Sequence, residues 1–223
     1  MRFEGLIFDF DGVLIESEFA GNKQLAEALT ALGHPTTVDD ALTHFTGLGG
    51  PDFLDAVAVW IGGRVPDAFH EARAIEDARA LAEGVGEVIG AVAFVRSLPP
   101  ALPKAIASSS TTRWIEAHLA HIGLADAFGD HIYSGREHVK RGKPAPDIYL
   151  HAAARIGVPI DRVAIIEDSP VGATGAVASG AYVIGLAAGS HCRDGHGDIL
   201  LARGVDAVAH DFTEVARLLS AAA

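Results

Sequence analysis

The 223-residue chain lacks the features that mark several classes of protein. Its single cysteine, Cys192, excludes an internal disulfide framework and is typical of a reducing compartment. No apolar stretch approaches the ~18 residues that a membrane span needs. The first residues run directly into a predicted strand, without the layout of a signal peptide. These absences predict a cytoplasmic protein that does not enter a membrane.

Positive charge is also scarce. Lysine and arginine total 17 residues against 29 acidic ones, for a net charge of −12. Nucleic acids and anionic membranes are bound by basic patches, so neither is an expected partner. A small anionic ligand stays possible, because distant charges are screened beyond about 8 Å and a nearby metal ion or lysine would dominate. We expect a monomer or a weak homodimer.

The most informative stretch lies at residues 8–14, FDFDGVL, after a short apolar strand predicted at residues 3–8. Strand side chains alternate between faces, so Asp9 and Asp11 should project the same way. Like charges this close repel, unless a cation lies between them. A hard divalent cation with oxygen ligands, Mg²⁺, fits that place. The alternative is a simple turn that uses Asp and Gly as turn formers.

The rest of the chain has two parts. Residues 17 to about 83 are helical in pattern, whereas from residue 87 short apolar strands alternate with helices. The further strands are predicted at residues 104–107, 131–134, 162–166, 181–186 and 206–209. The helices are predicted at residues 23–32, 38–45, 53–61, 67–81, 87–98, 111–122, 146–156, 171–179, 199–203 and 213–219.

This alternation predicts an α/β fold, a Rossmann-like parallel sheet with helices on both faces. An all-helical insert interrupts it directly after the first strand. We assign residues 1–15 and 87–223 to the α/β core and residues 16–86 to the helical insert.

Reactive residues follow successive predicted strands, where parallel sheets bind their ligands. Ser108 and Ser109 follow the second strand, in a hydroxyl-rich helix start that suits a phosphate. Lys143 lies between Gly and Pro after the third strand, and Glu167 and Asp168 end the fourth. Each of these residues could instead have a purely structural role, as a helix cap, a solvated loop charge or the start of a helix. Their coincidence at four strand ends favours a catalytic site.

With these motifs the chain resembles the haloacid dehalogenase superfamily, in particular its capped sugar-phosphate phosphatases and β-phosphoglucomutase-like members. The resemblance covers nearly the whole chain, and the helical insert lies where that family has its helical cap domain. It implies a Mg²⁺-dependent phosphatase that hydrolyses a small phosphorylated metabolite, a sugar phosphate or sugar-acid phosphate.

The resemblance also implies roles for individual residues. Asp9 would be the nucleophile that forms an aspartyl-phosphate, and Asp11 the general acid and then base. Ser108 and Lys143 would act with them in catalysis, and Lys143 would also keep Asp9 ionised. The implied phosphate-binding residues are Gly12, Ser108, Ser109 and Lys143. The implied Mg²⁺ ligands are Asp9, the Asp11 backbone carbonyl and Asp168, with Glu167 as a secondary contact.

Specificity is expected from the helical insert, which would close over the site. Candidate substrate contacts are Asn22, Lys23, Gly47 and, from the core, Arg113, although charges on a helical insert are usually solvated.

Two alternatives stay open. A phosphosugar mutase of the β-phosphoglucomutase type would carry a histidine and an arginine in neighbourhoods that here read residues 19–22 and 47–50, and neither group is present. A non-catalytic phosphometabolite-binding protein would keep the fold without turnover. The intact set of Asp9, Asp11, Lys143 and Asp168 argues against it.

Other conspicuous residues receive ordinary interpretations. Trp60 and Trp114 lie at helical apolar positions and are expected in the core. His191 and His196 flank Cys192 in a loop, but their spacing matches no zinc motif and a zinc site is not expected there.

Overall fold

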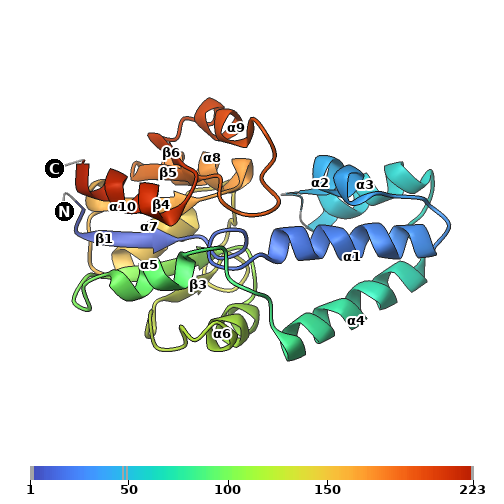
Figure 1. Cartoon of the computed structure of the whole chain (residues 1–223), viewed down its shortest axis with the longest axis horizontal. Helices are drawn as coiled ribbons and strands as arrows, with labels where there is room; N and C mark the ends of the chain where they lie inside the picture. The colour runs from blue at the N-terminus through green and yellow to red at the C-terminus, as the bar shows by residue number, and fades with distance from the viewer. Residues whose placement is uncertain (1–2, 47, 49, 222–223) are drawn as a thin grey trace.

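The structure is a computed structural model that describes residues 3–46, 48 and 50–221. The sheet and its helices form one part of the molecule, from which the helices within residues 17–83 project (Figure 1). Both chain ends lie at the far side of the sheet from these helices, as Figure 1 shows.

The sheet is parallel throughout the described part of the chain. Its strands are β1 (Gly5–Phe8), β2 (Lys104–Ser108), β3 (Ile132–Ser134), β4 (Val163–Glu167), β5 (Tyr182–Leu186) and β6 (Ala207–Ala209). They are arranged in the order β3-β2-β1-β4-β5-β6. The central strands β1 and β4 are buried over their whole length, which explains why they carry no polar side chain before Glu167 at the end of β4. The predicted α/β parallel sheet is therefore confirmed.

Helices cover both faces of this sheet. They are α5 (Ala91–Ser97), α6 (Thr112–His121), α7 (Asp147–Arg155), the short 3₁₀ helix η1 (Ile160–Arg162), α8 (Pro170–Ser179), α9 (His196–Ala202) and α10 (Phe212–Ala221). Along β1, Leu6 and Phe8 enter a cluster with residues of α5, α6 and α10. Ile7, on the opposite face, packs with residues of α7, α8 and α9. The period of two along the strand thus divides the core into two layers.

The helical insert contains α1 (Ser17–Ala31), α2 (Val38–Phe45), α3 (Gly50–Ile61) and α4 (Asp67–Glu83). It has its own buried cluster, which includes Leu25, Phe45 and Phe69. Thr37 and Asp40 start α2 with a reciprocal capping box. The chain enters and leaves the insert side by side, since the Glu16 N–H donates to the Gly86 carbonyl at 2.9 Å. The assignment of residues 16–86 to a separate domain stays a prediction.

Two helix starts differ from the predicted ones by more than three residues. Helix α1 begins at Ser17 rather than at residue 23, because its first residues, SEFAGN, lack a simple apolar stripe. Helix α5 begins at Ala91 rather than at residue 87. Glu87 forms an antiparallel bridge with Ile15, and Gly90 then turns the chain with φ at +86°.

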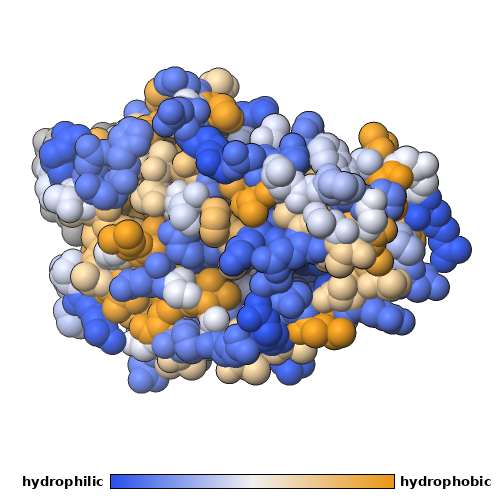
Figure 2. Space-filling model, turned by 45° about the vertical axis from the view of Figure 1, so that its right-hand side comes forward, coloured by the Kyte–Doolittle hydropathy of each residue, from blue (hydrophilic) through white to orange (hydrophobic). Residues whose placement is uncertain are grey.

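No described helix combines the length and the apolar character that a bilayer crossing requires. On the face shown in Figure 2, hydrophilic residues predominate and hydrophobic ones lie in small separate patches.

Candidate active site

The sheet order brings the predicted motifs together at the carboxyl ends of the strands. Strand β1 lies between β2 and β4, so Phe8 is in register with both Ile106 and Ile166. The backbone N–H of Asp9 continues this pairing and donates to the Ile166 carbonyl at 2.9 Å. Residues that follow these three strands therefore meet, although more than half of the chain separates the first from the last.

Lys143 is the centre of a buried ion cluster. Its Nζ lies 2.7 Å from Asp9 Oδ1 and 2.6 Å from Glu167 Oε1, and its side chain is only 4% exposed. Glu167 Oε1 also accepts a hydrogen bond from the Tyr149 hydroxyl at 2.8 Å. Glu167 Oε2 accepts from the Ser169 backbone N–H at 2.9 Å and from its hydroxyl at 3.1 Å. Both oxygens of Glu167 are thus occupied by the protein, which fits a secondary place near a metal ion.

The charges in this cluster shift one another's pKa. Burial alone would lower the pKa of Lys143, but the carboxylates of Asp9 and Glu167 outweigh it and raise that pKa well above its usual value. The pKa of Glu167 is lowered, because Lys143 and its hydrogen-bond donors overcome burial. Burial and repulsion by Glu167 raise the pKa of Asp9, and the adjacent ammonium of Lys143 offsets only part of this effect.

Asp168 lies beside this cluster without a hydrogen bond. It is 1% exposed, and neither of its carboxylate oxygens accepts a hydrogen bond from the described residues. His191 Nε2 lies 2.9 Å from Oδ2, but burial lowers the pKa of His191 and keeps the imidazole neutral. Burial and Glu167 raise the pKa of Asp168 well above its usual value.

These carboxylates fit a divalent cation. Asp9, Glu167 and Asp168 each offer an oxygen within 4.8 Å of the others. When they are ionised, three carboxylates against one ammonium leave two negative charges in a buried place. An all-oxygen donor set with this charge suits Mg²⁺.

Asp11 is held separately by four donors. Its Oδ1 accepts from the Ser17 hydroxyl at 2.7 Å and from the Trp114 indole N–H at 3.0 Å. Its Oδ2 accepts from the hydroxyls of Ser108 at 3.2 Å and Ser110 at 2.6 Å. Trp114 was expected only in the core, but its ring is half-buried and its indole nitrogen fixes Asp11.

The predicted phosphate-binding residues lie around this centre. The Ser108 hydroxyl also accepts from the Ser110 backbone N–H at 2.9 Å, whereas the Ser109 N–H donates to no described residue. Gly12 donates its N–H to the Ile15 carbonyl at 2.8 Å. A Cβ on Gly12 would lie 2.0 Å from Asp168 Oδ2, and its φ is +78°. Only glycine allows this approach, whatever its part in phosphate binding.

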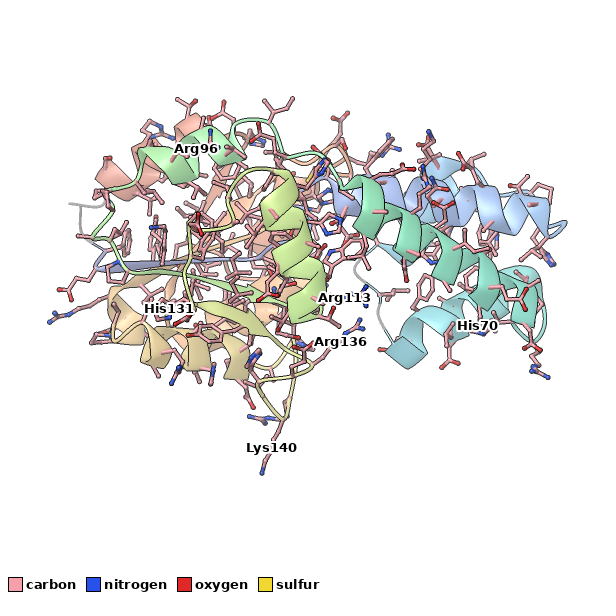
Figure 3. The ribbon with its side chains drawn as sticks, turned by 90° about the horizontal axis from the view of Figure 1, so that it is seen from below. His70, Arg96, Arg113, His131, Arg136 and Lys140 are labelled. Carbon is pink, nitrogen blue, oxygen red and sulfur yellow. The ribbon has the colours of Figure 1, made fainter. Side chains whose placement is uncertain are left out.

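The predicted substrate contacts are less closely gathered. Asn22 is buried and donates to the Glu18 carbonyl at 2.8 Å and the Thr46 hydroxyl at 3.3 Å, so it joins α1 to the end of α2. Lys23 is exposed on α1. Arg113 is exposed at the start of α6 and lies at the end of the core nearest the insert, as does Arg136 (Figure 3). Gly47 lies outside the described residues. Their substrate roles stay predictions.

Sequence reasoning did not single out Tyr149, Ser17 or Glu18. Tyr149 looks like an ordinary apolar-face residue of α7, and only the structure shows its hydroxyl at Glu167. Glu18 lies half-buried in the first turn of α1, where burial and the nearby Asp168 and Asp11 raise its pKa to about 7. The Glu-Ser-Glu run at residues 16–18 was the only sequence feature that could have indicated it.

We predict that Lys143→Met lowers the free energy of unfolding of the metal-free protein by about 3–5 kcal/mol, because it leaves two buried carboxylates without their cation. Urea denaturation measures the change. Lys140→Met is the matched control, since Lys140 lies in the same loop, is exposed and points away from the body of the protein (Figure 3). That control should change stability by less than about 0.5 kcal/mol. Equal effects of the two variants would contradict the buried ion cluster.

We also predict that Asp168→Asn raises the melting temperature of the metal-free protein at neutral pH. The pKa of Asp168 is raised on folding, so its favourable contribution is complete below the unfolded value of about 3.9 and is lost as pH rises through the folded value. Mg²⁺ at ~100 times its Kd should add about 5–10 °C to the wild type. It should add little to the variant. Calorimetry with and without Mg²⁺ tests both statements. A metal-free variant that melts no higher than the wild type would refute the first, and full stabilisation of the variant by Mg²⁺ would refute the second.

Comparisons with known proteins agree with this geometry. The family model of haloacid dehalogenase-like hydrolases matches residues 3–180. Fructose-1-phosphate phosphatase YqaB of Escherichia coli (strain K12) is 34% identical over 183 residues, which cover 80% of this chain and 94% of the relative. The crystal structure of a HAD family hydrolase from Deinococcus radiodurans R1, with bound phosphate and sodium, has 30% identity and a TM-score of 0.84, covering 99% of this chain and 96% of that one. Protein SUPPRESSOR OF QUENCHING 1, chloroplastic, of Arabidopsis thaliana is 36% identical over 185 residues, but the match spans only 17% of that protein. As its motifs predict, the chain belongs to the haloacid dehalogenase-like hydrolase family.

Proposed function

We propose that this protein is a Mg²⁺-dependent phosphatase that hydrolyses a small phosphorylated sugar or sugar acid. One observation carries the proposal: the buried Lys143–Asp9 ion pair lies beside Asp168, a buried carboxylate to which no described residue donates a hydrogen bond. Phosphoryl transfer needs positioning and charge stabilisation more than other chemistry, and this cluster supplies both.

Asp9 is the proposed nucleophile. Its Oδ1 is held by Lys143, whereas Oδ2 accepts no hydrogen bond from a described residue and is available for attack. Oδ2 forms a bond to phosphorus while the bond from phosphorus to the ester oxygen breaks. The product is an aspartyl-phosphate and an alcohol, so one difficult hydrolysis becomes two easier steps.

Asp11 is the proposed proton carrier. It gives its proton to the departing ester oxygen, and it then takes a proton from the water that attacks the aspartyl-phosphate. That attack forms a new bond from water to phosphorus, breaks the bond to Asp9 and releases inorganic phosphate. The hydrogen bonds from Ser17 and Trp114 hold the Asp11 carboxyl in place for both transfers.

The remaining groups bind the phosphoryl oxygens. We assign this task to the Ser108 hydroxyl, the Ser109 N–H and the Lys143 ammonium. Asp9, Asp168 and the Asp11 carbonyl would hold Mg²⁺, with Glu167 behind them. When bound, the ion supplies positive charge that offsets the phosphoryl oxygens.

The relatives support the substrate class. A fructose-1-phosphate phosphatase is similar over most of this chain, and a similar hydrolase structure holds phosphate. The sequence at residues 19–22 and 47–50 lacks the histidine and the arginine expected of a mutase, which favours hydrolysis.

We predict that a screen of phosphate esters with Mg²⁺ yields free phosphate in equal amount to the alcohol product, and that Asp9→Asn abolishes it. Asp130→Asn is the control. This exposed aspartate precedes β3 and therefore lies at the amino ends of the strands, opposite the catalytic motifs. It should keep full activity. An isomerised ester with little phosphate would establish the mutase instead. Wild-type rates in Asp9→Asn would remove Asp9 as the nucleophile.

We predict that Asp11→Asn separates the two proton transfers. With an alkyl phosphate, the rate should fall about 10²–10⁴-fold, because the leaving oxygen receives no proton. A p-nitrophenyl ester needs no such proton, so one equivalent of nitrophenol should appear rapidly before slow turnover. Intact-protein mass spectrometry should then show a trapped phosphoryl group. Equal losses with both esters, without a burst, would argue against the acid role.

A further inference from the structure

A second group of possible metal ligands lies next to the phosphate site. His191 and Cys192 belong to the loop after β5, and His196 begins α9. These three side chains each offer a nitrogen or sulfur atom within 4.8 Å of the others. None of them has a role in the proposed hydrolysis.

The imidazole of His191 is closely enclosed. The side chain is 1% exposed, and a Cβ on Gly189 would lie 2.6 Å from the ring, while one on Gly12 would lie 2.9 Å from it. Its Nδ1 has no hydrogen-bond partner among the described residues, and its Nε2 lies 2.9 Å from Asp168 Oδ2. Two glycines therefore make room for an imidazole that faces an aspartate without other donors.

The other two side chains face the same place. Cys192 Sγ lies 3.4 Å from His191 Nε2. His196 Nε2 lies 2.6 Å from the backbone carbonyl of Asp168, and the two imidazole rings are nearly perpendicular, with centroids 5.6 Å apart. Two imidazoles and one thiol thus lie together, and one of the imidazoles faces the Asp168 carboxylate.

This donor set differs in kind from the oxygen cluster. Two nitrogens, one sulfur and one carboxylate oxygen are ligands of Zn²⁺ and of Co²⁺, which binds the same sites. Mg²⁺ prefers oxygen ligands and would not compete for nitrogen and sulfur. Asp168 is shared, because its Oδ2 faces His191 and it also belongs to the oxygen cluster.

We propose that His191, Cys192, His196 and Asp168 form a binding site for Zn²⁺, and that its occupation withdraws Asp168 from Mg²⁺. The neutral His191 binds the ion through Nε2, which faces Asp168 Oδ2, and carries its single ring proton on Nδ1; a proton held by Asp168 leaves to solvent. Cys192 binds as the thiolate and releases its proton to solvent. Burial raises the pKa of this thiol to about 12, so the thiol is protonated until the metal arrives. Zinc binding needs nothing from the proposed function, whereas inhibition of turnover rests on it.

The first experiment detects the site without any assay of activity. Co²⁺ is added to the purified full-length protein, and a thiolate-to-cobalt charge-transfer band is recorded in the near ultraviolet. We expect one equivalent to bind, and Zn²⁺ in excess to abolish the band. Cys192→Ser should remove the band and weaken Zn²⁺ binding by more than ~100-fold, since it deletes a direct ligand. His196→Ala should also weaken Zn²⁺ binding.

The matched control distinguishes the two metal sites. Asp9→Asn alters the oxygen cluster but leaves the four proposed ligands intact, so it should keep the cobalt band. Zn²⁺ that binds Cys192→Ser as tightly as wild type, and is lost in Asp9→Asn, would place the ion at the oxygen cluster and overturn the proposal. A wild type without the band would also overturn it. The melting temperature of each variant shows whether it is folded.

A second measurement tests the sharing of Asp168. Mn²⁺, used as the probe of the oxygen cluster, is followed by electron paramagnetic resonance during addition of Zn²⁺. We expect Zn²⁺ to release Mn²⁺ from the wild type but not from Cys192→Ser, and to inhibit phosphate release only in the wild type. A cobalt band in a protein without phosphatase activity would refute the proposed function and leave the zinc site standing. Phosphatase activity without the band would refute the zinc site and leave the proposed function standing.

Discussion

The structure at the carboxyl ends of the strands depends on one buried ammonium that lies among three carboxylates. Each ion in such a place costs several kcal/mol of hydration, and only close partners and hydrogen bonds offset this cost. Lys143 therefore needs both Asp9 and Glu167, and Glu167 needs Tyr149 and Ser169. The partners come from the ends of β1 and β4, from α7 and from the loop after β3, so the ion cluster ties four segments together.

The same arrangement leaves Asp168 incompletely satisfied. In the described part of the chain its oxygens have no hydrogen-bond donors, although the carboxylate of Glu167 beside it has four. These two neighbouring residues at the end of β4 thus have different roles. Glu167 stabilises the lysine, and Asp168 stays available to a cation. Natural proteins commonly keep such a locally unfavourable group where ligand binding requires it.

The strands could be predicted from the sequence, because the pattern of apolar residues indicates them. The convergence of the residues that follow the strands could also be predicted, because parallel strands bind ligands at their carboxyl ends. The partners of these residues could not. Trp114 reaches Asp11 across 103 positions of sequence, and its helical spacing is also that of a core residue. Likewise, Gly172 looks like any helical glycine, yet a Cβ there would lie 1.6 Å from Glu167 Oε1. The convergence of His191, Cys192 and His196 depends on how a loop turns, which spacing alone does not reveal.

The place of β1 in the sheet has a consequence for biosynthesis. This strand emerges from the ribosome before its neighbours, yet Phe8 pairs with Ile106 on one side and Ile166 on the other. Closing such long loops costs entropy before any contact repays it, which slows folding. The nascent chain therefore carries an apolar strand with unsatisfied edges until most of the polypeptide has been translated.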